Sequence, residues 1–204
     1  MIIWEGKKIE ETSIGKYLRE KYPGTKSTFL TRRKQVKGDY LPLLQDDFGM
    51  NNDCTLTALT TVISGAVGQE PQKVYDVVEK YAKQYGFKGN GTNPLFIKSI
   101  FDKTLKEFGI NKKTKAGYLK SVGYGFSKIK ELIDKDIPVV LSVYKDGRNY
   151  YINHTIAVVG YSTYRVDKNQ SLEPFLLVYD NWEPKIRVID YKTLSLISSI
   201  NFFE

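Results

Sequence analysis

Residues 51–63 read NNDCTLTALTTVI, a polar turn that runs directly into an apolar segment. Apolar residues recur in it at helical spacing, although the threonines and a partial alternation also fit a strand. We interpret the segment as a helix, because Asn52 and Asp53 are good N-caps and glycines follow at 65 and 68. Cys54 would then lie in the first helical turn. Unpaired N–H groups and the helix dipole at that position lower the pKa of a thiol.

The rest of the chain divides into a helical half and a strand-rich half. Apolar residues at helical spacing, ended by glycine or proline, predict helices at 71–85, 93–108 and 127–136. Segments rich in Val, Ile, Tyr and Phe, separated by turn residues, predict strands at 138–144, 150–161, 174–180, 185–191 and 195–203. This segregation predicts an α+β fold in one domain, 1–204. A mainly helical lobe at 1–135 would face a mainly antiparallel β lobe at 136–204 across a cleft.

The formal charge is +8, and its excess is local. Residues 1–40 and 101–135 are the basic segments, but acidic residues interrupt them, and no nucleic-acid-binding motif accompanies the charge. We therefore expect a solvated surface and no specific nucleic-acid site. No apolar run approaches the ~20 residues of a membrane span, and the first residues do not resemble a signal peptide. The chain as given reads as a cytoplasmic protein, or as a secreted one if an export signal precedes it.

The chain has one cysteine, Cys54, and one histidine, His154. His154 begins an apolar segment, and Asp180 follows later in Asp-Asn-Trp. A catalytic thiol needs a base, and the base needs a carboxylate or amide to orient it. Taken singly, the cysteine fits a buried small hydrophobe, the histidine a structural residue and Asp-Asn a turn. Together, in the order Cys, His, acid, they favour a catalytic triad. One His and one Cys without close ligand spacing do not predict a metal site, and no cofactor is expected.

At these residues the sequence resembles the papain-like cysteine peptidases, in particular the compact bacterial branch that includes the bacteriocin leader (double-glycine) peptidases. Three motifs carry the resemblance: a cysteine that opens a helix after a polar loop, a histidine followed by an apolar strand ending in Gly-Tyr, and Asp180-Asn181-Trp182. The resemblance implies a two-lobed fold in which Cys54 is the nucleophile, His154 the base and Asp180 its orienting group. Trp182 would shield the histidine–acid contact from water.

The sequence departs from the family pattern around the cysteine. The glycine and tryptophan that commonly flank the papain cysteine are missing, and Phe48 occupies the position of the oxyanion-hole glutamine, six residues before Cys54. Gln45, nine residues before, could supply the donor through a longer loop, or Asn51 or Asn52 could supply it instead. The other donor implied by the resemblance is the main-chain N–H of Cys54.

The function predicted is that of a cysteine peptidase or related amide hydrolase acting on a peptide or protein through an acyl-enzyme. Two alternatives stay open. An acyltransferase or transglutaminase-like enzyme would use the same triad but resolve the acyl-enzyme with an amine. A catalytically silent peptide-binding module would keep the scaffold, and its cysteine would react as an ordinary thiol. Substrate specificity, the role of residues 1–40 and the oligomeric state are not encoded in any motif we recognise.

Overall fold

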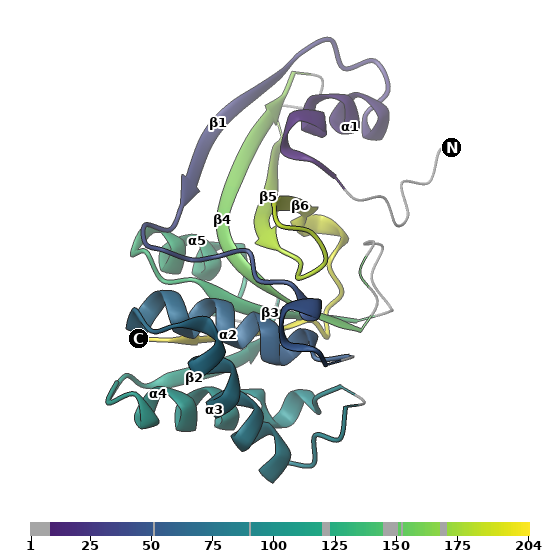
Figure 1. Cartoon of the computed structure of the whole chain (residues 1–204). Coiled ribbons are helices and arrows are strands. Elements are labelled where there is room, and N and C mark those ends of the chain that lie inside the picture. Colours follow the sequence, from purple (N-terminus) through teal and green to yellow (C-terminus); the bar gives the residue numbers. More distant parts are fainter. Residues whose placement is uncertain are drawn as a thin grey trace.

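The computed structural model of the chain describes residues 9–50, 52–89, 91–119, 123–144, 151, 153–167 and 171–204. The predicted α+β fold is confirmed (Figure 1). The helices are α1 (Ile14–Lys21), α2 (Cys54–Val67), α3 (Pro71–Gln84), α4 (Ile97–Glu107) and α5 (Phe126–Asp134). The strands are β1 (Thr28–Gln35), β2 (Thr114–Tyr118), β3 (Val139–Val143), β4 (His154–Val166), β5 (Leu172–Tyr179), β6 (Ile186–Asp190) and β7 (Ser199–Phe203).

All strands of the described chain join one antiparallel sheet, in the order β2-β7-β3-β4-β5-β6. β4 is long enough to pair with β3 through its first half and with β1 through its second half. The sheet curves along this strand in Figure 1. β1 and β2 come from the half of the chain that we predicted to be mainly helical, so that half contributes two strands to the sheet.

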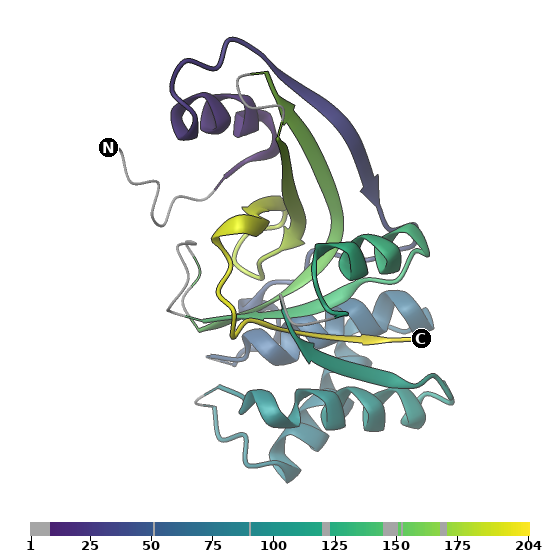
Figure 2. The ribbon, with the colours of Figure 1, turned by 180° about the vertical axis from the view of Figure 1, so that it is seen from behind.

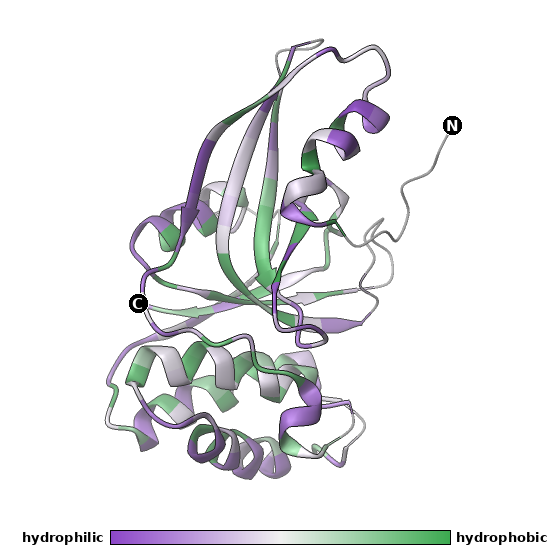
Figure 3. Cartoon of the chain, turned by 45° about the horizontal axis from the view of Figure 1, so that its top comes forward, coloured by the Kyte–Doolittle hydropathy of each residue, from purple (hydrophilic) through white to green (hydrophobic). Residues whose placement is uncertain are grey.

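The helices α2, α3 and α4 lie on one face of the sheet, and α5 lies on the other, as the reverse view in Figure 2 shows. α2 is the helix predicted from the 54–63 segment, and it ends at Gly68, which has a φ of 65°. Every residue from Thr55 to Ser64 is buried, because α3 covers one side of the helix and the sheet covers another. In Figure 3 hydrophilic residues prevail in the part of the helical layer that lies farthest from the sheet.

A second, smaller core forms between α1 and the far ends of the strands. Its buried residues are Ile9, Ile14, Tyr17, Leu18, Val166, Phe175, Leu177 and Val188. The N-terminal segment thus packs against the sheet away from the helical layer, where it lies at the upper end of Figure 1. Among the described helices, none is both long and apolar enough to cross a membrane.

Candidate active site

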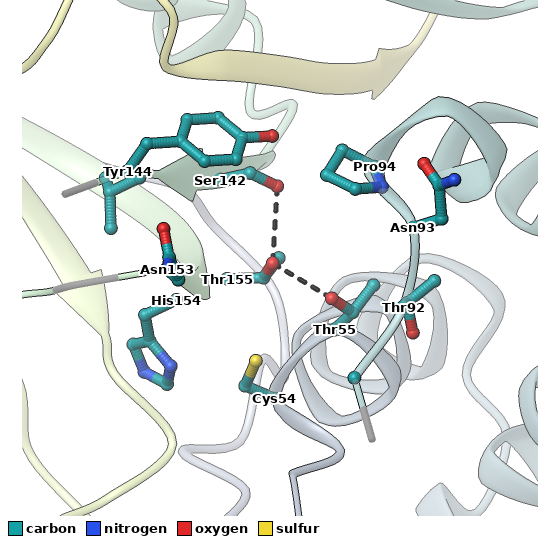
Figure 4. A pocket seen from close by; sticks show the side chains of 12 residues that line it. Cys54, Thr55, Thr92, Asn93, Pro94, Ser142, Tyr144, Asn153, His154 and Thr155 are labelled. Atoms are coloured by element: carbon teal, nitrogen blue, oxygen red, sulfur yellow. Dashed lines mark hydrogen bonds between the residues drawn. The ribbon is translucent and has the colours of Figure 1, made fainter. Parts of the chain in front are cut away.

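The structure places Cys54 and His154 at the edges of one pocket. Cys54 is the first residue of α2, and His154 is the first residue of β4. The pocket has a volume of about 380 Å³ and opens between the start of α2, the 91–94 loop and the β3–β4 edge. In Figure 4 the Cys54 sulfur points into this pocket, and the His154 imidazole lies beside it. The two residues that the sequence paired are therefore neighbours in space.

Thr55 and Thr155, which directly follow Cys54 and His154, are hydrogen-bonded to each other. The Thr55 hydroxyl donates to Thr155 Oγ1 over 2.9 Å, and Ser142 Oγ lies 3.2 Å from the same atom (Figure 4). Asn181 adds a second tie, because its Nδ2 donates to the carbonyl of Cys54 at 3.1 Å and to the carbonyl of Thr155 at 2.9 Å. These bonds fix the start of α2 against the start of β4.

The His154 ring is held by the 180–182 segment. Nε2 lies 2.7 Å from the main-chain carbonyl oxygen of Asp180. A carbonyl oxygen can only accept, so Nε2 carries the proton and the neutral ring has its lone pair on Nδ1. Trp182 stacks on the imidazole, with ring centroids 4.2 Å apart, and Tyr151 lies parallel to it at 5.6 Å. The ring is thereby fixed in both orientation and tautomer.

Asp180 contacts His154 through its main-chain carbonyl and not through its carboxylate. Oδ2 accepts from the Tyr151 hydroxyl at 2.9 Å, and Oδ1 accepts from the main-chain N–H groups of Trp182 at 3.1 Å and Glu183 at 3.3 Å. The carboxylate is completely buried. We had expected it to orient the imidazole directly, whereas it orders the turn that presents the Asp180 carbonyl and the Trp182 ring to His154.

Burial raises the pKa of the Cys54 thiol above its ordinary value. Hydrogen bonding from the Thr155 main-chain N–H and from Thr55 acts in the opposite direction, and the net direction is upward. The sequence had suggested a lowered pKa, because it shows the helix N-terminus but not how deeply the sulfur is buried.

The model of the Peptidase_C39 like family matches residues 33–195, which include Cys54, His154, Asp180 and Trp182. The chain belongs to this family. The resemblance to papain-like cysteine peptidases is thus confirmed, and the family suggests that the protein is a cysteine peptidase. No curated protein and no solved structure matches the chain.

In this Peptidase_C39-like chain, the oxyanion candidates lie around a separate hollow. Gln45 and Asn52 line a pocket of about 260 Å³ with Asn181 and Trp182, next to the Cys54–His154 pocket but not within it. Gln45 Oε1 accepts from the Trp182 indole N–H at 2.8 Å, and its Nε2 lies 3.3 Å from Asp53 Oδ1. Because a carboxamide nitrogen has two N–H donors, the bond to Asp53 occupies only one of them. Asn51 lies outside the described residues.

Sequence reasoning missed several residues that build this site in the Peptidase_C39-like fold. They are Thr55, Ser142, Tyr151 and Thr155, together with the bridging amide of Asn181. The two threonines directly follow the cysteine and the histidine, which was the one available signal. Only the packing of α2 against β4 shows that they meet. Within the described chain, no group of three or more His, Cys, Asp or Glu side chains could hold a metal ion.

Proposed function

We propose that the chain is a cysteine peptidase that cleaves a peptide or protein substrate, with Cys54 as the nucleophile and His154 as the general base. One observation carries this assignment. The only cysteine and the only histidine open α2 and β4, and both side chains line one pocket. The hydrogen bonds of Asn181 hold the two segments together. Membership of the Peptidase_C39 like family supports the reaction type.

The reaction begins with the neutral imidazole. Because Nε2–H donates to the Asp180 carbonyl, Nδ1 is the nitrogen that can take the Cys54 proton. The sulfur then forms a bond to the substrate carbonyl carbon, and the pair of electrons on the carbonyl moves to oxygen. The imidazolium returns the proton to the leaving amine as the C–N bond breaks. Water, deprotonated by the same ring, releases the acyl group and restores the thiol.

Asp180 and Trp182 act through His154. The Asp180 carbonyl stabilises the imidazolium, because the Nε2–H bond strengthens when the ring becomes charged. Trp182 covers one face of the imidazole and limits water access to the bond, although the tryptophan itself is 41% exposed. The oxyanion would face the main-chain N–H groups at the start of α2, which have no partners inside the helix. Gln45 and Asn52 stay the candidate side-chain donors, and both line the neighbouring hollow.

The test uses a thiol-reactive peptide probe and a panel of peptide substrates. Cys54→Ala should abolish both labelling and cleavage, and His154→Ala should reduce cleavage by orders of magnitude with the fold retained. Ser64→Ala is the matched control, since it removes one buried polar atom from the last turn of the same helix and should leave turnover near wild type. Cleavage that survives Cys54→Ala would refute the proposal. Formation of a new amide when amines are added would instead assign acyl transfer.

A further inference from the structure

Arg187 lies beside the 180–183 turn that holds His154. It belongs to β6, where it pairs with Val178, two residues before Asp180. The residue is buried, and it does not line the Cys54–His154 pocket. A buried arginine needs acidic neighbours, because an unpaired charge is costly to remove from water. The partners of Arg187 therefore indicate what it does in the fold.

Three carboxylates surround the Arg187 guanidinium. Nη1 donates to Glu10 Oε1 at 3.0 Å, and Nη2 donates to the carboxylate of Glu183. Nε lies 4.0 Å from Asp180 Oδ2 and, within the described part of the chain, has no hydrogen-bond partner. Glu183 in turn donates its main-chain N–H to Asp180 Oδ1 at 3.3 Å. Arg187 thus contacts the turn twice, through the side chain of Glu183 and through the charge of Asp180.

The contact with Asp180 differs from the other two in its burial. The Glu10 and Glu183 side chains are 51% and 32% exposed, so water solvates them, whereas the Asp180 side chain is completely buried. Among the described residues, Arg187 is the only cation in ion-pair contact with Asp180. Little water screens buried charges, and removing one partner leaves the other uncompensated. Loss of Arg187 should therefore act mainly on Asp180.

A disturbance at Asp180 reaches His154 in one step. The Asp180 carboxylate orders the turn by accepting from the Trp182 main-chain N–H at 3.1 Å, and the Asp180 carbonyl accepts from His154 Nε2–H at 2.7 Å. If the carboxylate turns towards solvent, the carbonyl and the Trp182 ring move with it. The imidazole then loses the contact that keeps its proton on Nε2 and its lone pair on Nδ1.

We propose that Arg187 is a positioning residue for His154. By neutralising the buried Asp180 carboxylate, it keeps the 180–183 turn in the conformation that fixes the imidazole tautomer. Its place outside the Cys54–His154 pocket means that it acts through Asp180 and not on the reacting atoms. The inference rests on the proposed function only for its kinetic consequence, because the tautomer of His154 can be observed without any substrate.

The first experiment reads that tautomer directly. His154 is the only histidine, so long-range 15N–1H NMR spectra of protein without a histidine tag report its two ring nitrogens alone. At a pH where the ring is neutral, the wild type should show the proton fixed on Nε2. Arg187→Met removes the charge and should give an average of the two tautomers, whereas Arg187→Lys keeps a cation and should stay closer to wild type. A wild-type pattern in folded Arg187→Met would overturn the proposal.

Steady-state kinetics give the second readout. Arg187→Met should lower kcat by up to about 100-fold, since a small displacement of a catalytic group has that effect, while KM changes less. Arg33→Met is the matched control, because Arg33 forms an ion pair with Glu11 on a part of β1 that is far from the site in sequence and half exposed to water, and its kcat should stay near wild type. An unchanged kcat in folded Arg187→Met would contradict the positioning role.

A double variant keeps the test decisive if Arg187→Met does not fold. Asp180→Asn removes the buried charge but keeps an acceptor for the turn, so Arg187 should matter little in that background. Asp180→Asn/Arg187→Met should fold and should turn over at about the rate of Asp180→Asn. If the double variant also fails to fold, or if Arg187→Met costs as much in it as in wild type, Arg187 acts independently of Asp180 and the proposal is wrong.

The positioning role and the peptidase assignment fail in different ways. A wild-type protein that cleaves no peptide, yet changes its tautomer pattern in Arg187→Met, would refute the peptidase assignment and keep the positioning role. Cleavage by the wild type, with kcat and tautomer unchanged in Arg187→Met, would do the reverse.

Discussion

The His154 ring bonds to the main-chain carbonyl of Asp180, and this changes what a substitution at Asp180 should do. Asp180→Asn keeps an oxygen for the N–H groups of Trp182 and Glu183, so the turn and its carbonyl should stay in place. We expect kcat within about tenfold of wild type, whereas an asparagine in place of a direct triad carboxylate costs about 10⁴-fold. Steady-state kinetics on the folded Asp180→Asn variant measure kcat. A loss of kcat of about 10⁴-fold would show that the carboxylate itself acts on His154. Asp180→Ala, which empties the turn, should lose more than Asp180→Asn.

Asn181 offers a sharper test of positioning. Its φ of 63° suits asparagine, aspartate and glycine, so these residues can be exchanged without backbone strain. Asn181→Asp has the same shape but presents oxygens to the carbonyls of Cys54 and Thr155, which can only repel them. We expect Asn181→Asp to lower kcat more than Asn181→Gly does, with KM changed less than kcat. If both variants match wild type, the amide clamp has no part in aligning the cysteine and histidine.

We expect the Cys54 thiol to lose its proton at a higher pH than an ordinary thiol does. Because burial raises the pKa of Cys54, its alkylation by iodoacetamide should rise with a midpoint above the ordinary value of about 8.5. Thr55→Val removes a hydrogen bond that lowers this pKa, so its midpoint should lie higher still. A rate–pH profile of the free enzyme measures both. A fast reaction near pH 6 that depends on His154 would mean that a thiolate–imidazolium pair forms before substrate binds.

At the scale of elements, the sequence predicted the helices and strands that carry a strong apolar pattern. It did not predict β1 or β2, because most side chains of β1 face solvent and β2 is a short strand at the sheet edge. It also gave no role to α1, whose apolar residues meet partners more than 140 residues away. Residue spacing reports the local pattern of an element. It does not report which distant surface that element covers.

Hydrogen bonds and ion pairs to two buried carboxylates hold α1 against the sheet. Tyr17 and Lys21 both donate to Asp190, and Lys21 also reaches Glu173 at 3.1 Å. Lys192 donates to the other oxygen of Glu173 at 2.6 Å. Although burial alone raises the pKa of Glu173, hydrogen bonds from Lys192 and other neighbours outweigh it and lower the pKa to about 2.

This depressed pKa predicts an acid-sensitive contribution to stability. The unfolded chain protonates Glu173 near its ordinary pKa of about 4.3, so the stabilisation is present above that pH and is lost as pH falls towards 2. Glu173→Gln should lower the free energy of unfolding at neutral pH and flatten its decline between about pH 4.5 and 2. Urea unfolding across this range measures the slope. An unchanged slope in the variant would assign the acid sensitivity to other carboxyl groups.

Across the whole molecule, the Cys54–His154 pocket is lined by the start of α2 and by β3 and β4, where the helical layer meets one face of the sheet. The sequence paired Cys54 with His154, because each residue stands beside its own local motif, but it did not show that His154 contacts the main chain of Asp180. The pocket could not be predicted, since it depends on the register that sets Ser142 opposite Thr155 and Ser199. A register change of one residue would turn these side chains to the other face of the sheet.

Ion pairs across the whole molecule also decide how the basic segments present their charge. Four acidic residues that interrupt the basic segments, Glu10, Glu11, Glu107 and Glu131, all form ion pairs with lysine or arginine. Each pair sets an acidic side chain against basic neighbours, which interrupts the positive charge that could otherwise follow a phosphate backbone.

Nucleic-acid binding should therefore be weak, independent of sequence and lost near ~150 mM salt, because non-specific contacts depend on counterion release. Fluorescence anisotropy with labelled DNA and RNA over a salt series measures this. Sub-micromolar, sequence-dependent binding at ~150 mM salt would contradict the expectation. It would require a recognition surface that the paired acids leave open.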